Sequence, residues 1–267
     1  MIDGDMDDSY PYAGAISLRT LGNTVMRPFS SSAALKFSDF RGRMYRGPSA
    51  NLVFGFDATL RPPVAASTTS TMWECVSGKG PRCAGNVIVA AQQDTDGHRF
   101  VYINNNLFTV STTGVWGNGG GWSINTEHTL VIWVKPEVNL YGHLIHFYAT
   151  DNATRMLSLH CPWIGNGHVY YDVRGCCGGN QRLNGPMHNA SNKTFMAFRT
   201  QQHGFPNRQI YRDGFWLYTS GTNTTSTSFT WGTKRELFQN WRGRVYCIYL
   251  FNCALSNEEI DRFYFTT

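Results

Sequence analysis

Residues 242–252 (RGRVYCIYLFN) and the residues that follow, 254–260 (ALSNEEI), decide the fold class of this 267-residue chain. β-Branched and aromatic side chains fill residues 244–251, which predicts a buried β-strand. Ser256 and Glu259 have the spacing of a capping box, so a short helix is expected directly after the strand. This helix would dock on a β-sheet through side chains that share one face, which are Ile260, Phe263 and Tyr264.

Strands of the same kind recur along the chain from about residue 84. Each segment is rich in β-branched and aromatic residues and is bounded by Gly, Asn or Asp. Short strands at a spacing of about ten residues are typical of an all-β sandwich or jelly roll. The strongest hairpin signal is Asp213-Gly214, because a type I′ turn needs two residues that tolerate positive φ. The other predicted strands cover 87–91, 99–104, 128–135, 143–150, 156–161, 168–173, 194–200, 209–212, 215–219 and 228–231.

The composition excludes several classes of protein. Charged residues make up 15% of the chain and aromatic residues 14%, which fits neither a coiled coil nor a charge-driven disordered chain. The net charge is +5, but most basic residues are Arg residues scattered singly through strand-like segments, so we expect no nucleic-acid partner. The sequence has no apolar run of about 18 residues, and the acidic residues 1–8 do not resemble a signal peptide. We therefore expect no membrane segment and no Sec export.

Three regions follow one another along the sequence. Residues 1–50 hold too few apolar side chains for a core of their own, which predicts an extended attachment arm that is buried against another chain. Residues 51–83 combine Pro62-Pro63 with a Ser/Thr run at 67–71, which predicts a linker or an extended crossing segment. The sandwich is predicted over 84–267. The candidate partner-binding residues of the arm are Ile16, Leu18, Phe29, Leu35, Phe37 and Phe40.

The region 84–267 resembles the laminin-G-like, or concanavalin A-like, lectin/glucanase superfamily. Residues 210–214 (IYRDG) are similar to a hairpin of these domains, residues 128–136 (HTLVIWVKP) look like one of their strands, and residues 242–260 resemble their C-terminal ending. The resemblance implies an all-β, concanavalin A-like jelly-roll β-sandwich with one short C-terminal helix, preceded by an extended N-terminal arm. This fold carries lectins, hydrolases and adhesion modules, so the function has to come from the site.

The arm has a resemblance of its own. Residues 15–18 (AISL) and 35–42 (LKFSDFRG) are similar to paired segments that open many tail, neck and other virion proteins of tailed phages and large algal viruses. This resemblance implies a structural protein of a virion, anchored by the arm in a capsid or tail partner, with the sandwich displayed outward.

Catalysis has little support in the sequence. Glycosidases on this fold place paired carboxylates on one strand, where alternate residues face the same sugar. No predicted strand carries such a pair, and Glu258 and Glu259 belong to the predicted helix. We therefore predict a protein that is not an enzyme.

Two groups of residues raise the question of a metal site. Asp94-Thr95-Asp96-Gly97 is rich in oxygen ligands, as in a calcium loop, but it also suits a plain hairpin turn, which we favour. Adjacent cysteines do not easily share one tetrahedral zinc ion, so for the second group we favour buried or disulfide-bonded thiols. We predict no metal and no cofactor. The second group consists of Cys161, Cys176, Cys177, His160 and His168, and Cys75 and Cys83 form another potential disulfide.

The best candidate for a ligand-binding surface is the loop-rich segment 163–182. Sugar sites combine an aromatic platform with Asp, Asn and Arg hydrogen bonding, and this segment has all of them. The alternative is structural: Asp172 pairs with Arg182 and holds the sheet together. The candidate ligand-binding residues are Trp163, Asn166, His168, Asp172, Arg174 and Arg182.

The main hypothesis is a non-enzymatic virion protein, a capsid decoration, tail or fibre component, whose lectin-like domain binds host-surface glycans. Its predicted partners are other virion proteins and copies of itself in the particle. The first alternative is a secreted or cell-surface carbohydrate-binding lectin. The second is a degenerate glycanase.

Overall fold

A computed structural model describes residues 51–77, 81–111, 123–124, 127–137, 142–149, 156–173, 182–186, 192–201, 208–220 and 229–265. The chain divides into two compact units, residues 1–37 and 38–267, and the described residues all belong to the second. The predicted arm, with its six candidate partner-binding residues, lies outside the described residues. Within the described residues, no helix has the length and apolar character needed to cross a membrane.

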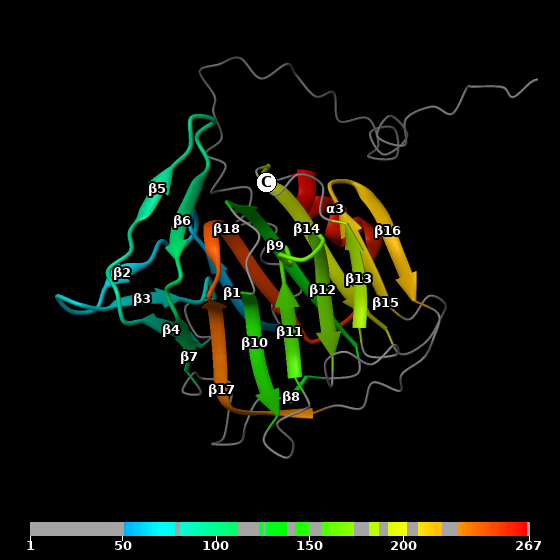
Figure 1. The fold of residues 1–267 in the computed structure, drawn as a ribbon, viewed down its shortest axis with the longest axis horizontal. Coiled ribbons are helices and arrows are strands. Elements are labelled where there is room, and N and C mark those ends of the chain that lie inside the picture. Colours follow the sequence, from blue (N-terminus) through cyan, green and yellow to red (C-terminus); the bar gives the residue numbers. More distant parts are fainter. Residues whose placement is uncertain are drawn as a thin grey trace, which may run out of the picture. The chain divides into compact units, whose positions relative to one another are not determined.

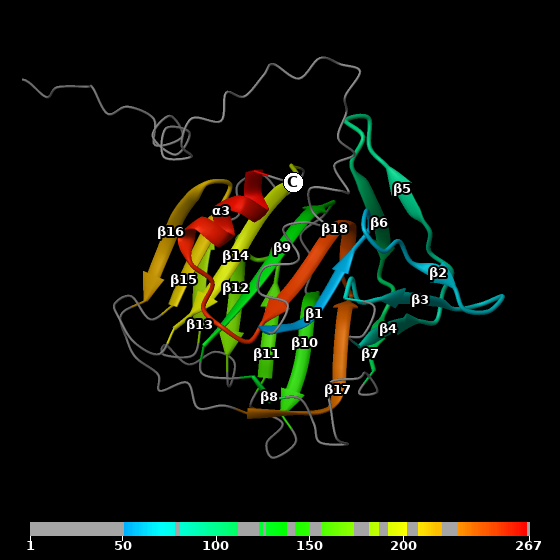
Figure 2. The same cartoon turned by 180° about the vertical axis from the view of Figure 1, so that it is seen from behind.

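The described unit consists of two antiparallel sheets (Figures 1 and 2). In sheet A the strand order is β16-β15-β14-β9-β18-β6-β5, and β1 also pairs with β18. The bounds of these strands are β1 Leu52–Asp57, β5 Ala91–Gln93, β6 Arg99–Asn104, β9 His128–Pro136, β14 Thr194–Thr200, β15 Arg208–Arg212, β16 Phe215–Ser220 and β18 Arg242–Phe251.

In sheet B the strand order is β13-β12-β11-β10-β17-β7-β4-β3-β2, and β8 pairs with β17. Figure 1 looks onto β17, β10, β11, β12 and β13 of this sheet. The bounds are β2 Val64–Ala65, β3 Thr71–Glu74, β4 Arg82–Gly85, β7 Phe108–Val110, β8 Ser123–Ile124, β10 His143–Ala149, β11 Met156–His160, β12 His168–Val173, β13 Arg182–Pro186 and β17 Phe229–Gln239.

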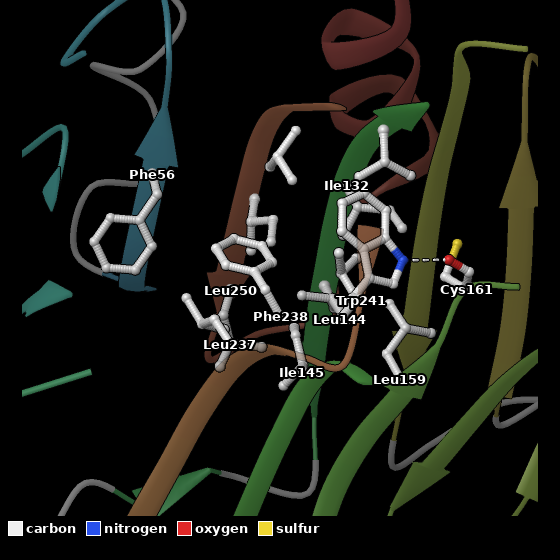
Figure 3. Packing of buried hydrophobic residues seen from close by; sticks show 14 of the residues in the cluster. Phe56, Ile132, Leu144, Ile145, Leu159, Cys161, Leu237, Phe238, Trp241 and Leu250 are labelled. Carbon is white, nitrogen blue, oxygen red and sulfur yellow. Dashed lines mark hydrogen bonds between the residues drawn. The ribbon is translucent and has the colours of Figure 1, made fainter. Parts of the chain in front are cut away.

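The main core lies between the two sheets. Sheet A contributes alternate residues such as Ile132 and Leu250, and sheet B contributes residues such as Ile145 and Leu159, all without solvent exposure. Trp241, between β17 and β18, packs in this core and donates a 2.6 Å hydrogen bond from Nε1 to the carbonyl oxygen of Cys161 (Figure 3). The indole therefore links the connection between β17 and β18 to the end of β11.

The C-terminal helix α3 (Asn257–Phe265) covers the outer face of sheet A (Figure 2). The predicted capping box is present: the Ser256 amide donates to Glu259 Oε2 at 2.7 Å, and the Glu259 amide donates to Ser256 Oγ at 3.2 Å. Ile260 is fully buried, and the ring of Phe263 lies 5.4 Å from that of Tyr249. The predicted all-β jelly-roll sandwich with one short C-terminal helix is confirmed.

The sandwich begins earlier than predicted. Residues 51–83, predicted as a linker or crossing segment, supply β1, which pairs with the central strand β18, as well as β2, β3 and the first half of β4. Pro62-Pro63 lies in the connection before β2, and the Ser/Thr run lies in the turn between β2 and β3, where Ala66 and Ser70 share a backbone hydrogen bond. These breaker residues therefore mark turns inside the domain. The phenyl rings of Phe54 and Phe56 are fully buried, which ties the segment to the core.

The hairpin prediction at Asp213-Gly214 is confirmed. Both residues have positive φ, 44° and 98°, between the paired strands β15 and β16. Asp213 Oδ1 also accepts a 2.8 Å hydrogen bond from the Phe195 amide. Asp213 therefore forms part of the turn and also binds the turn to β14.

Candidate functional site

A row of polar side chains crosses sheet B, in which each residue lies directly opposite the next one on the neighbouring strand. Glu236 lies opposite His146, His146 opposite Ser158, Ser158 opposite Asp172 and Asp172 opposite Arg182. Residues that face each other across antiparallel strands project from the same side of the sheet. Their neighbours along each strand are buried in the main core, so this row belongs to the other side, which we call the outer face of sheet B.

Three histidine rings stack on this outer face, and we call them the histidine ladder: His143, His146 and His160. The rings of His143 and His146 are nearly parallel, with centroids 4.0 Å apart, and the rings of His143 and His160 are 3.9 Å apart. Trp163 continues the ladder, since its ring lies 4.6 Å from that of His160. The result is a continuous aromatic cluster over β10, β11 and the turn after β11, in which His146 and His160 are buried and His143 and Trp163 are half-buried.

Backbone and side-chain acceptors fix the orientation of two of these rings. His160 Nδ1 donates a 2.9 Å hydrogen bond to the Gly142 carbonyl, and His146 Nδ1 donates a 2.7 Å hydrogen bond to Gln239 Oε1. Because a carbonyl oxygen only accepts, the neutral ring of His160 carries its hydrogen on Nδ1 and leaves Nε2 as an acceptor. Burial lowers the pKa of His160, against the opposing effect of the Gly142 hydrogen bond.

The other end of the face is built around an ion pair. Asp172 has no solvent exposure, and its two carboxylate oxygens accept hydrogen bonds of 2.6 and 2.7 Å from Arg182 Nε and Nη2. Ser158 Oγ donates a longer bond of 3.4 Å to Asp172. The guanidinium of Arg182 also lies 4.5 Å above the ring centroid of Tyr170. The pair therefore holds a flat aromatic ring beside the ladder.

The turn between β11 and β12 brings Trp163 and Asn166 to the same face. The Gly167 amide donates to the Trp163 carbonyl at 2.9 Å, which closes the turn, and Gly167 adopts a φ of 67°. Asn166 Nδ2 donates to the Tyr170 hydroxyl at 2.6 Å, and Asn166 Oδ1 accepts from the His168 amide at 3.0 Å. The asparagine thus links the turn that carries the tryptophan to the strand that carries Tyr170.

The structure brings most of the predicted ligand-binding residues together. Trp163, Asn166, His168 and Arg182 gather around Tyr170, whereas Arg174 lies outside the described residues. Asp172 is buried beneath Arg182, as the structural alternative predicts, so it positions the arginine and is not presented to a ligand.

Several residues of the face were not predicted as ligand-binding: most lie on β10, β11 and β17, outside the segment 163–182, and the sequence raised His160 only for a metal site. The signal that could have found them is a polar or aromatic residue at every second position of β11 and β12, opposite the apolar residues of the core. The missed residues are His143, His146, Tyr148, His160, Tyr170, Glu236 and Gln239.

The plain-turn interpretation of residues 94–97 agrees with the structure. The Gly97 amide donates to the Asp94 carbonyl at 3.0 Å in the turn between β5 and β6. Asp94 accepts from Arg244 at 2.5 Å and from the Tyr246 hydroxyl at 2.6 Å, and Lys193 pairs with both Asp94 and Asp96. The carboxylates of Asp94 and Asp96 therefore form ion pairs with Lys193 and Arg244.

The cysteines within the described part of the chain form no disulfide. Cys75 and Cys83 do not form the potential disulfide, and Cys161 is a buried thiol. Cys176 and Cys177 lie outside the described residues. Among the described residues, no three His, Cys, Asp or Glu side chains are grouped so as to hold a metal ion.

No protein-family model matches the chain, and no curated protein matches it in sequence. Solved structures do match. Domain 4 of a GH43 extracellular arabinanase from Geobacillus stearothermophilus, in complex with arabinotriose, has a TM-score of 0.52 and 14% identity over 79% of this chain and 98% of that one. A botulinum neurotoxin type C structure, which concerns cell entry through two ganglioside molecules, has a TM-score of 0.54 and 12% identity over 83% of this chain and 53% of that one.

A mutant of Trypanosoma rangeli sialidase with trans-sialidase activity is also similar, with a TM-score of 0.51 and 16% identity over 81% of this chain. The chain spans about a third of the sialidase and about half of the neurotoxin structures. At these identities the likeness shows the fold, a β-sandwich shared with carbohydrate-binding domains. Neither the comparisons nor the described residues bear on the virion role.

Proposed function

We propose that this protein is a non-enzymatic, lectin-like domain that binds an oligosaccharide on the outer face of sheet B. The observation that carries the proposal is the aromatic cluster of the histidine ladder and Trp163, with ring-centroid separations of 4.0, 3.9 and 4.6 Å, in which His143 and Trp163 are only half-buried. Sugar rings have an apolar face that packs on aromatic rings and a rim of hydroxyls that needs hydrogen-bond partners.

The groups around the ladder meet the second requirement. Exposed Asn184 lies opposite Tyr170 on the edge strand β13, and exposed Asn166 lies at the tip of the neighbouring turn. Amide side chains both donate and accept, which suits a hydroxyl. Since the ladder with Trp163 is longer than one sugar ring, the surface fits a chain of sugars better than a monosaccharide.

The carboxylates of the face support binding over hydrolysis. Glu236 on β17 and Asp172 on β12 are separated by β10 and β11, three strand spacings of about 4.8 Å, or about 14 Å in all. Glycosidases hold their two carboxylates about 5 to 9.5 Å apart. Asp172 is in addition buried against Arg182. We therefore propose that the described face binds a glycan without cleaving it.

A glycan array read with matched variants tests the proposal. Trp163→Ala should weaken binding by about 1 to 2 kcal/mol, roughly tenfold in affinity, because it removes one stacking platform. The matched control is Phe215→Ala, which removes another exposed aromatic ring, on β16 of sheet A. Absence of wild-type binding to any glycan, or equal effects of the two variants, would contradict the proposal.

The virion location, the virion partners of residues 1–50 and the assembly into homo-oligomers stay predictions of the sequence. The proposed glycan site does not depend on them.

A further inference from the structure

We infer that the histidine ladder makes this face selective for uncharged oligosaccharides at neutral pH and releases them on acidification. The inference rests on the proposed function, because it concerns the same face. It starts from the geometry of the three rings: His143 contacts both His146 and His160, and His160 contacts Trp163.

Contact between the rings opposes their joint protonation. Two positive charges about 4 Å apart repel each other strongly where solvent screens them poorly, and His146 and His160 are each only 6% exposed. The pKa of His160 is lowered first by burial, and the nearby His146 and Arg182 lower it further. Burial therefore favours the neutral form of His160, and the ring contacts oppose joint protonation of the ladder.

The charged and titratable groups around the ladder come from all the strands that surround it. On β17, Glu236 lies 4.0 Å from His146 Nδ1. On β12 and β13, Asp172 and Arg182 act on His160 with opposite signs and are bound to each other. The other titratable side chains close to the ladder are Tyr148, Tyr170 and His168.

This arrangement disfavours an anionic sugar at neutral pH. Among the described side chains of β10–β13 and β17 on this face, the cation is Arg182, and its Nε and Nη2 groups donate hydrogen bonds to Asp172. Glu236 adds a negative charge at the other end of the row. A sugar carboxylate would meet a carboxylate and neutral imidazoles, whereas hydroxyls would find acceptors and donors.

The sign of the pH effect follows from linkage. An uncharged sugar that covers the ladder removes the remaining water around the rings, which disfavours their charged form. Binding therefore releases protons, and affinity falls as the pH drops below the pKa values of the free protein. The loss is about tenfold per pH unit for each proton released. An anionic sugar would give the opposite slope.

The test measures affinity by calorimetry at pH 7.5, 6.5, 5.5 and 5.0. The uncharged probes are arabinotriose, cellohexaose and maltohexaose, and the anionic probes are 3′-sialyllactose and trigalacturonic acid. At least one uncharged probe should bind at pH 7.5 and bind more weakly at each lower pH. Affinity that is constant or rises on acidification, or preference for an anionic probe at pH 7.5, would overturn the inference.

Two variants separate the ladder from the rest of the protein. His143→Phe keeps a flat ring beside His146 and His160 but removes a titrating group, so the slope of affinity against pH should become shallower, whatever the change in affinity at pH 7.5. His98→Gln removes a histidine beside Trp133 on sheet A and should leave the pH dependence unchanged. No binding of any probe or array glycan at any pH would defeat the proposed function itself, whereas binding with a flat pH profile would defeat this inference alone.

Discussion

Asp172 shows how one residue of the site depends on another. Its carboxylate is fully buried and remains compatible with folding because Arg182 supplies two hydrogen bonds and Ser158 a third. A carboxylate removed from water without such partners is costly. The same arginine covers the ring of Tyr170, so the ion pair links the stability of sheet B to the shape of the proposed sugar surface.

Arg182→Ala should lower the free energy of unfolding by about 3 kcal/mol, because it leaves the Asp172 charge buried without its main partner. Urea unfolding followed by tryptophan fluorescence measures the change. The double variant Asp172→Asn/Arg182→Gln should recover part of the loss, since it removes both charges. A loss under about 1 kcal/mol for Arg182→Ala would show that water replaces the arginine.

The ion pairs of Lys193 with Asp94 and Asp96 make the stability of the folded protein depend on pH in the acid range. The hydrogen bond from Lys193 lowers the pKa of Asp96 to about 2. The pKa of Asp94 is also lowered, because hydrogen bonds from Tyr246, Lys193 and Arg244 outweigh its partial burial, which alone would raise it. A pKa lower in the folded state contributes stability that is complete above the unfolded value of about 3.9 and disappears as the pH falls through the folded value.

Lys193→Met should therefore reduce the loss of melting temperature between about pH 4 and pH 2, the interval in which these carboxylates take up protons. Thermal unfolding of wild type and variant at several pH values in this range provides the measurement. Because Asp96 is largely exposed, the effect should be modest and should shrink with added salt. Parallel pH profiles for the two proteins would argue against this ion-pair cluster.

Among the elements, helix α3 begins at the residue that the sequence predicts. The prediction succeeds because a capping box involves only residues close together in the sequence. Ser256 and Glu259 exchange both expected hydrogen bonds, and the apolar face of the helix lies on sheet A. The same holds for the Asp213-Gly214 turn, whose positive φ values depend on those two residues alone. Local chemistry is sufficient to predict such features.

Ser256→Ala should lower the free energy of unfolding by about 1 kcal/mol, through loss of the bond to the Glu259 amide. Ser256→Thr, which keeps a hydroxyl at this position, should cost clearly less. Chemical denaturation of the three proteins makes the comparison. Equal losses for both variants would mean that the side-chain cap contributes little and that packing of Ile260 holds the helix.

The strands β1 to β4 show where sequence reasoning ends. β2 has two residues and β3 and β4 have four each, so their alternation is too short to stand out from the Pro and Ser/Thr residues around them. The partner of β1 is β18, with Leu52 opposite Phe251. A pairing between residues so far apart cannot be detected from local patterns.

The candidate site has the same limitation at the scale of the whole molecule. Trp163, Asn166 and His168 are close in sequence and carry a recognisable combination of aromatic and polar groups. The ladder instead lies on the neighbouring strands β10 and β11, and the strand order of sheet B adds Glu236 and Gln239 from the distant strand β17 to the same face. Binary patterning identifies the sandwich, but only strand order shows which face carries the histidines.

Removal of residues 1–50 should leave the sandwich folded, because the described strands begin at Leu52 and the core is made by later residues. The shortened protein should show a single cooperative thermal transition, retain its β-type circular dichroism spectrum and bind the same array glycans. If residues 1–50 are an attachment arm, particles should no longer incorporate it. Normal incorporation of the shortened protein would contradict the arm.

The position of β18 also governs the order in which the protein can fold. This strand comes last in the sandwich along the chain, yet it is hydrogen bonded to β9, to β6 and to β1. A nascent chain emerging from the ribosome therefore carries three strands of sheet A that each have one edge without a partner until β18 is made, and such an edge is open to pairing with other chains. Folding should be slow, as expected for distant strand pairings, and should be completed only after β18 has been synthesised.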